Sequence, residues 1–145
     1  MVSEYAVEMT ETAEKTYRRL YEEAQECIEA GQTSNSKVTR FKMVEEAIDK
    51  LIPSDPFCPE RSLSGPLSNI FRISKGRLRI FYIGSSKARR IIILFISERL
   101  RKQGDVNDPY SLFSRLVLSG KYNDLFEKLG VRPPDKRMSV SHSIQ

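Results

Sequence analysis

The apolar run "IIILFI", Ile91–Ile96, constrains the fold of this 145-residue chain more than any other segment. Successive side chains of a strand point to opposite faces, so a strand of this composition buries both of its faces. The run is far shorter than the roughly 20 residues of a membrane-spanning helix. The acidic amino terminus, "MVSEYAVEMTE", lacks the basic-then-apolar order of a secretion signal. We therefore expect a cytoplasmic protein with no membrane partner, built around a central strand.

The segment "FRISKGRLRIFYIG", residues 71–84, predicts a β-hairpin around a Lys75-Gly76 turn, because glycine accepts a positive φ. In that register Arg72 lies opposite Arg79, and Arg77 shares their face. Like charges in direct opposition cost about 0.2–1 kcal/mol. This cost suggests that the arginines hold an anion. The other face of the predicted hairpin is apolar and consists of Phe71, Ile73, Leu78, Ile80 and Tyr82.

The remaining periodicity predicts an α+β fold in one domain, residues 1–131. A short strand at residues 4–9 precedes two amphipathic helices, the first capped by Thr10 and the second running over residues 37–52 until Pro53 ends it. We expect this helical hairpin to pack on one face of a small, mainly antiparallel sheet, with the arginines on the other face. Short helices at residues 109–118 and 122–129 form a C-terminal helical extension from about residue 111. Residues 132–145 are expected to be a disordered tail.

Charge is distributed unevenly along the chain. Residues 1–60 carry 7 Lys and Arg against 13 Asp and Glu, whereas residues 61–102 carry 11 against the single Glu98. Such concentrated positive charge is typical of a surface that binds a polyanion. The alternative is a solvated face, or one that the acidic helices of the same chain neutralise.

Metal and histidine chemistry have little support in the sequence. The chain has two cysteines, Cys27 and Cys58, and one histidine, His142, in a polar tail. These residues do not form a metal-binding motif, so we expect no metal and no cofactor. Most histidine-based acid–base catalysis is also excluded.

Four segments in order carry a resemblance to a known family: "YAVEMTETAEK", the hairpin above, "IIILFIS" and "ERLRKQGDVNDPY". Together they resemble the RelE/ParE superfamily of bacterial type II toxins, in its RelE-like mRNA interferase branch. The resemblance covers about residues 5–110. It implies a RelE-like fold and an endoribonuclease that inhibits translation by cleaving mRNA in the ribosomal A site. It also implies a cognate antitoxin protein, with which the toxin forms a hetero-oligomer.

The resemblance further implies a set of site residues. The family's catalytic positions are matched by Arg72, Arg79, Arg101 and Tyr110. The family often has lysine where this chain has Arg72. The neighbouring basic residues expected to bind RNA are Lys75, Arg77, Arg99 and Lys102, and Arg99 competes with Arg101 in register.

Arginine suits only part of the implied chemistry. Cleaving RNA without a metal requires activation of a 2′-OH, stabilisation of a pentavalent phosphorane and protonation of the 5′ oxygen. A guanidinium binds phosphate oxygens in pairs but is a poor base, so Arg79 and Arg101 are expected to clamp the phosphate. Tyr110 is expected to orient the 2′-OH, transfer a proton or stack on a base. Lys75 is a further candidate for the base.

Two other functions remain open from the sequence. One is a ParE-like poison of DNA gyrase, against which the presence of all four catalytic positions argues. The other is an inactive relative that only binds an antitoxin, which Arg72 in place of lysine favours. The residues also have plainer interpretations: Arg72 and Arg79 as a solubilising face that contacts antitoxin carboxylates alone, and Tyr110 as the N-terminal anchor of the last helix, packing on Phe113.

Overall fold

The computed structural model describes residues 5–63, 65–98 and 109–134. Its strands are β1 (Ala6–Met9), β2 (Phe71–Lys75), β3 (Leu78–Ser85) and β4 (Arg90–Ser97). Its α-helices are α1 (Glu11–Glu29), α2 (Ser36–Glu46), α3 (Ile52–Ser54), α4 (Pro109–Leu118) and α5 (Asn123–Leu129). Within these described residues, no helix combines the length and the apolar character needed to cross a membrane.

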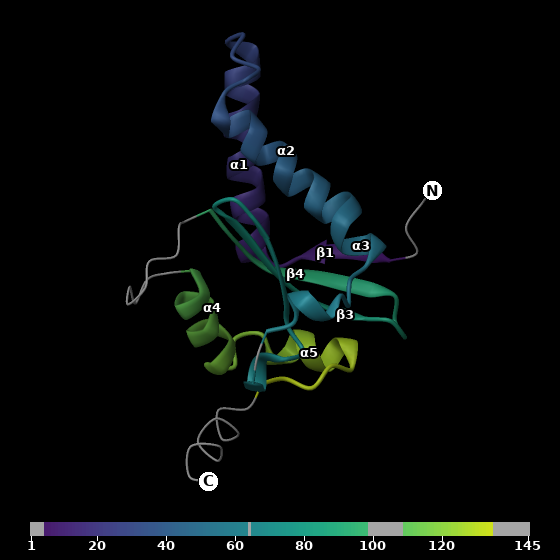
Figure 1. Ribbon diagram of the computed structural model, residues 1–145. Coiled ribbons are helices and arrows are strands. Elements are labelled where there is room, and N and C mark those ends of the chain that lie inside the picture. The colour runs from purple at the N-terminus through teal and green to yellow at the C-terminus, as the bar shows by residue number, and fades with distance from the viewer. Residues whose placement is uncertain (1–4, 64, 99–108, 135–145) are drawn as a thin grey trace.

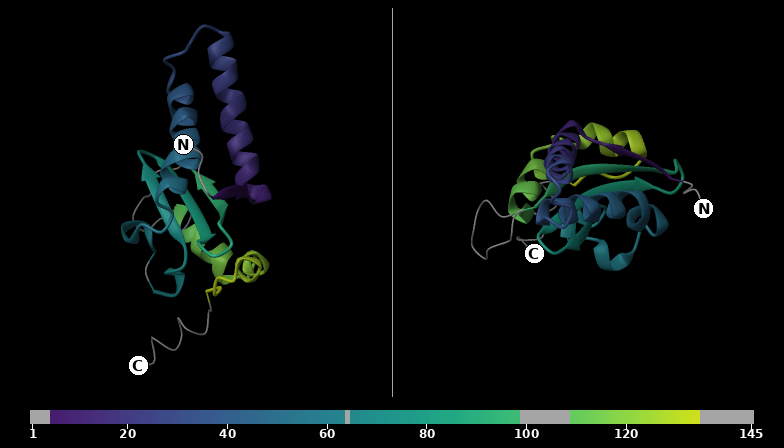
Figure 2. Two further views of the ribbon diagram at one scale, coloured as in Figure 1. Left: turned by 90° about the vertical axis from the view of Figure 1, so that its right-hand side faces the viewer. Right: turned by 90° about the horizontal axis from the view of Figure 1, so that it is seen from above.

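The four strands form one sheet in the order β1-β4-β3-β2. β1 runs parallel to β4, and the β2-β3-β4 meander is antiparallel. Helices α1 and α2 form a hairpin on one side of the sheet that extends beyond the strands, while α4 and α5 lie on the other side (Figures 1 and 2). The predicted α+β fold, with its helical hairpin and C-terminal helices, is confirmed.

Thr10 joins the start of α1 to the centre of the sheet. Its hydroxyl accepts a hydrogen bond from the backbone N–H of Ala13 (3.1 Å), the capping contact expected at this position. The same hydroxyl donates to the carbonyl of Leu94 (2.8 Å). Leu94 is skipped in the pairing of β4 with β3, because the register shifts there by one residue. The cap therefore also satisfies a carbonyl at the irregular point of the central strand.

Pro53 does not end the second helix, contrary to the prediction. The chain passes from α2 through a π-helical turn, Ala47–Leu51, into α3, which ends at Ser54. In the wider turn the N–H of Ile52 bonds to the carbonyl five residues back, at Ala47. Pro53 then stands in the first turn of α3, where its missing N–H is not needed.

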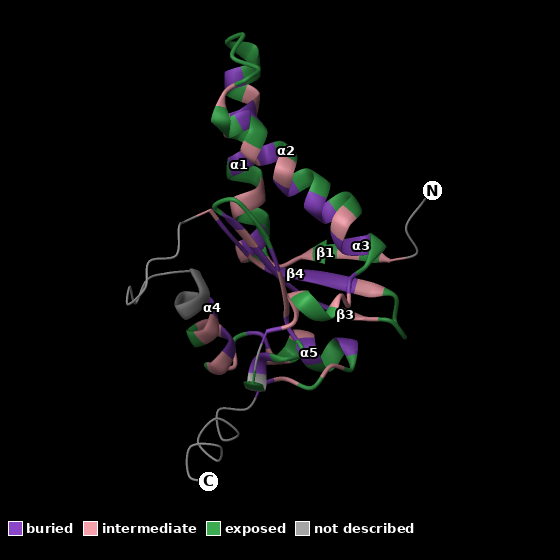
Figure 3. Cartoon of the chain, in the orientation of Figure 1, coloured by how far each residue is buried: buried purple, intermediate pink, exposed green. Residues whose placement is uncertain are grey.

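The sheet separates two hydrophobic cores (Figure 3). β4 contributes to both, as predicted: Ile91 and Ile93 face the helical hairpin, whereas Ile92 and Leu94 face the C-terminal helices. On the second side, the ring of Phe113 from α4 stacks on Phe81 from β3, with centroids 4.1 Å apart. The C-terminal helices are therefore a packed layer over the sheet face that was expected to carry the arginines.

Candidate functional site

The β2-β3 hairpin turns at Gly76-Arg77, not at Lys75-Gly76 as predicted. Lys75 pairs with Leu78, and Gly76 has a φ of +56°. A two-residue turn with a positive φ at its first central position is of type II′, which favours glycine there. The prediction placed the glycine one position too late in the turn. Arg77 consequently belongs to the turn and does not share a strand face with the other arginines.

The corrected register removes the direct opposition of two arginines. Arg72 lies opposite Phe81, and Arg79 lies opposite Ser74. Because the pairing changes by two residues in total, every strand side chain keeps its predicted face. Arg72 and Arg79 still share a face, now as diagonal neighbours. The Cα atoms of such neighbours lie about 7–8 Å apart on a regular ladder, and their Cβ atoms somewhat closer. The predicted repulsion is therefore smaller, and the two cations remain close enough to contact one bound anion.

The guanidinium of Arg79 is held by backbone carbonyls. Its Nη1 donates to the carbonyls of Gly76 (2.6 Å) and Leu78 (2.9 Å), at the turn of its own hairpin. The side chain is half-buried, and within the described part of the chain it contacts no carboxylate. Nε and Nη2 have no acceptor among the described residues. Among the described residues, Arg79 is thus held in place by carbonyls, with no carboxylate on its charge and no acceptor on its second edge, an arrangement suited to a phosphate.

Other arginines of the chain are bound to carboxylates. Glu98, at the end of β4, accepts from Arg19 of α1 (2.6 Å) and from Arg40 of α2 (2.9 Å). Arg90 of β4 pairs with Glu8 of β1. The single acidic residue of the basic segment thus neutralises arginines of the helices. Among the described residues, no ion pair joins Arg79, Arg77 or Lys75 to a carboxylate. The alternative from the sequence, that the acidic helices neutralise the basic segment, therefore does not apply to these three residues.

Lys75 and Arg77 face a different part of the molecule from Arg79. Both line a groove of about 420 Å³ between the hairpin turn and α2. The helix contributes Arg40 and Met43 to it, and the remaining lining residues are Ser34, Ser36, Thr39, Gly76 and Leu78. Lys75 pairs with Leu78 and so belongs to the sheet face under the helical hairpin. The structure therefore does not bring the candidate base Lys75 together with Arg72 and Arg79.

The other predicted site residues are only partly described. Arg99, Arg101 and Lys102 lie outside the described residues. The backbone of Tyr110 belongs to the first turn of α4. Since Phe113 of the same helix stacks on Phe81, α4 packs on the sheet face that carries Arg72 and Arg79. The position of Tyr110 in the fold is thus on the arginine side of the sheet.

Sequence reasoning missed two features of this region. Arg40 was not considered, although it lines the groove beside Lys75 and Arg77. The carbonyls of Gly76 and Leu78 were also missed, and only the exact turn type could have pointed to them. In the part of the chain that the structure describes, no group of three or more His, Cys, Asp or Glu side chains is arranged to hold a metal ion.

A model of the YhaV toxin family, described as toxins with endonuclease activity of toxin–antitoxin systems, matches residues 5–132. A search of curated proteins finds no match.

Solved structures with a similar fold include a RelBE toxin–antitoxin complex from Mycobacterium tuberculosis, at 20% identity and a TM-score of 0.49, covering 70% of this chain and 97% of that one. The isolated RelE toxin of E. coli is similar at 18% identity and a TM-score of 0.42, covering 79% and 99% of the two chains. The intact E. coli RelBE complex gives 17% identity and a TM-score of 0.41, covering 68% and 99%.

Proposed function

The chain belongs to the YhaV family of toxins with endonuclease activity from toxin–antitoxin systems, and from this premise we propose that it cleaves mRNA on the ribosome without a metal. This membership confirms the predicted class of protein, a toxin of a toxin–antitoxin system. The proposed substrate is mRNA in the ribosomal A site, and the proposed consequence is inhibition of translation in the cytoplasm. The proposed catalytic unit is residues 1–131.

The observation that carries the proposal is the state of Arg79. Its guanidinium is positioned by two carbonyls of the hairpin turn and meets no carboxylate among the described residues. Hydrogen-bond donors fixed before the substrate arrives need no reorganisation when negative charge develops on a phosphorane. A surface arginine kept for solubility needs no such support from the backbone. Arg79 therefore fits the role of the phosphate clamp.

The proposed reaction is a transesterification. The 2′-oxygen attacks the adjacent phosphorus, the bond to the 5′-oxygen breaks, and the products carry a 2′,3′-cyclic phosphate and a 5′-OH. One proton moves from the 2′-OH to the leaving 5′-oxygen. Arg79 and Arg101 stabilise the phosphorane, and Arg72 contacts the same phosphate from its diagonal position on the sheet. Tyr110 is the proposed group for orienting the 2′-OH, since Lys75 belongs to the other sheet face.

The proposed protein partner is a cognate antitoxin. An antitoxin must block the sheet face that carries Arg72 and Arg79, and a negatively charged segment over this face would do so by binding the guanidinium of Arg79. The toxin and antitoxin would then form a hetero-oligomer in which RNA is excluded. The basic residues at the hairpin turn, Lys75 and Arg77, are proposed to contact RNA phosphates outside the catalytic position, together with Arg99 and Lys102.

Substitution of Arg79 tests the proposal. Purified wild type and Arg79→Ala are incubated with mRNA alone and with mRNA on ribosomes, and cleavage is followed over time. We expect Arg79→Ala to lower cleavage about 100-fold or more, because one preorganised donor group is lost. Arg79→Lys should recover only part of the activity, since lysine keeps the charge but not the planar fork.

Arg18→Ala is the matched control, because it removes the same charge from an exposed position on α1. It should cleave like the wild type. Full activity of a folded Arg79→Ala variant would overturn the proposal. Growth arrest with DNA damage and intact mRNA would instead support the gyrase alternative.

A further inference from the structure

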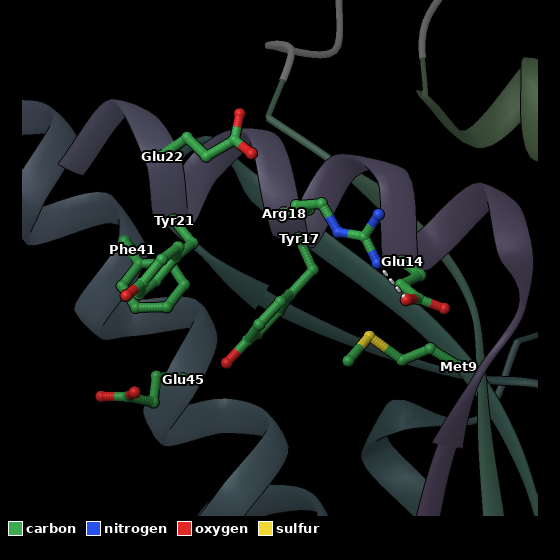
Figure 4. A pocket seen from close by; sticks show the side chains of 8 residues that line it. All are labelled: Met9, Glu14, Tyr17, Arg18, Tyr21, Glu22, Phe41 and Glu45. Carbon is green, nitrogen blue, oxygen red and sulfur yellow. Dashed lines mark hydrogen bonds and ion pairs between the residues drawn. The ribbon is translucent and has the colours of Figure 1, made fainter. Parts of the chain in front are cut away.

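A groove lies between α1 and α2, on the side of the sheet away from Arg79. Its volume is about 590 Å³. Figure 4 shows side chains from both helices around it, with Met9 at the end of β1. The lining residues are Met9, Glu14, Tyr17, Arg18, Tyr21, Glu22, Phe41 and Glu45. None of them belongs to the site described above.

The floor of the groove is aromatic. Phe41 of α2 meets Tyr17 and Tyr21 of α1 edge to face, with ring centroids 5.3 and 5.4 Å apart. Tyr21 is 48% exposed, and among the described residues only Ile28, at 42%, is a comparably exposed large hydrophobic side chain. Residues seven apart on a helix share a face, so Tyr21 and Ile28 lie on the same face of α1. The exposed ring of Tyr21, packed beside Phe41, is the apolar surface of the groove that a partner side chain can bury.

The rim of the groove is acidic. Glu14, Glu22 and Glu45 line it, and the one cation among the lining residues, Arg18, is paired with Glu14 (2.6 Å). The pKa of Tyr17 is raised, mainly by burial and further by the nearby carboxylates of Asp49 and Glu45. This negative field repels RNA phosphates, so the groove does not extend the RNA surface. It favours a cationic occupant, whose ammonium or guanidinium groups also bind aromatic faces.

We propose that this groove docks a basic segment of the cognate antitoxin, with an apolar side chain seated on Tyr21 and Phe41 and with Lys or Arg residues beside Glu22 and Glu45. The inference rests on the proposed function for the identity of the partner. The lining of the groove determines which segment fits. Its carboxylates favour a positively charged side chain, and its aromatic rings favour an apolar one.

In this proposal, one surface of the toxin binds the antitoxin and a different surface is blocked by it. It lies on the helical hairpin, whereas Arg72 and Arg79 belong to the opposite face of the sheet. A segment that neutralises the arginines must be acidic, and a segment that fits the groove must be basic. One antitoxin thus holds the toxin through the groove and blocks the phosphate site through a different segment.

Charge reversal tests the docking site. The full chain is prepared as wild type, as Glu22→Lys/Glu45→Lys and as Tyr21→Ser, and each is titrated calorimetrically with the purified cognate antitoxin. We expect both variants to bind the antitoxin about tenfold more weakly or worse. Tyr21→Ser removes the apolar contact, and Glu22→Lys/Glu45→Lys removes the charge complementarity. RNA cleavage in the absence of antitoxin should not change, since no lining residue belongs to the phosphate site.

The matched control is Glu26→Lys/Glu46→Lys, which makes the same charge change at exposed positions of the same two helices outside the groove. It should bind like the wild type. Equal binding by all variants, or equal weakening by the control, would overturn the inference. A wild-type homodimer lost on Glu22→Lys/Glu45→Lys would overturn it in favour of a second copy. If the groove variants bind the antitoxin more weakly but the wild type cleaves no RNA, the docking site stands and only the proposed function is overturned.

Discussion

The two faces of the sheet differ in how completely their polar groups are satisfied. Under the helical hairpin, Thr10 caps α1 and bonds to Leu94, and the buried Tyr82 donates to the carbonyl of Pro56 (2.7 Å). Under α4 and α5, three buried side-chain atoms have no hydrogen-bond partner within the described chain: Ser114 Oγ, Tyr122 OH and Asn123 Oδ1.

The less satisfied face is also the face that carries Arg72 and Arg79. Buried polar groups without partners cost stability, so each such group calls for an explanation. The comparison teaches that the two layers hold the sheet in different ways. The polar groups named under the helical hairpin are paired, whereas the C-terminal layer packs through apolar rings and keeps these unpaired polar atoms on the side where we propose the phosphate site.

The largest expected effect on stability comes from Phe113→Ala. The side chain is fully buried and stacks on Phe81, so its removal leaves a cavity and is expected to cost about 3–5 kcal/mol of unfolding free energy. Phe113→Leu should cost less, because it retains most of the apolar volume. Urea unfolding measures both. A loss below about 1 kcal/mol for Phe113→Ala would mean that α4 contributes little to the second core.

A smaller effect is expected from Glu98→Ala, which leaves Arg19 and Arg40 without their shared carboxylate. Since these groups are partly exposed, the loss should be about 1 kcal/mol and should shrink in high salt. Glu23→Ala, which removes only a helical pair with Arg19, is the control and should cost less. An equal loss from both variants would show that Glu98 does not connect the helical hairpin to β4.

Effects of the same size or smaller come from one substitution made on each face. Tyr82→Phe removes a hydroxyl that bonds to Pro56 and is expected to cost about 1 kcal/mol. Tyr122→Phe removes a buried hydroxyl that has no partner among the described residues and is expected to be neutral or stabilising by up to about 1 kcal/mol. Thermal unfolding of both variants measures the difference. Equal costs would remove the contrast between the two faces.

The same tyrosines predict a loss of stability at high pH. Burial raises the pKa of Tyr82 and of Tyr122, and at Tyr82 the Arg61 guanidinium partly offsets the rise. The unfolded phenol loses its proton near pH ~10, whereas the folded phenol keeps it. The folded state then holds more protons, so unfolding free energy falls as the pH rises above about 10. Tyr122→Phe should make this fall less steep.

Much of the fold follows from the sequence because apolar periodicity reports burial directly. The run Ile91–Ile96 identified a strand buried on both faces, and the bounds of α4 were predicted at Pro109–Leu118. The hairpin register did not follow, because a glycine fits either central position of a two-residue turn. The continuation past Pro53 depends on a π turn, which the local sequence does not specify.

The candidate site was less predictable because it depends on contacts across the chain. The shared face of Arg72 and Arg79 was correct, since alternation survives a two-residue change in register. The assignment of Lys75 as the base does not fit the structure, which brings it to the α2 groove. The support of Arg79 by the carbonyls of Gly76 and Leu78 arises only once the turn is formed.

The most direct test of the central claim is to map mRNA 5′ ends after brief induction of the wild-type chain and of Arg79→Ala. The account predicts new ends within translated codons in cells with the wild type, and their absence with the folded variant. Intact mRNA during growth arrest by the wild type, or the same new ends with Arg79→Ala, would contradict it.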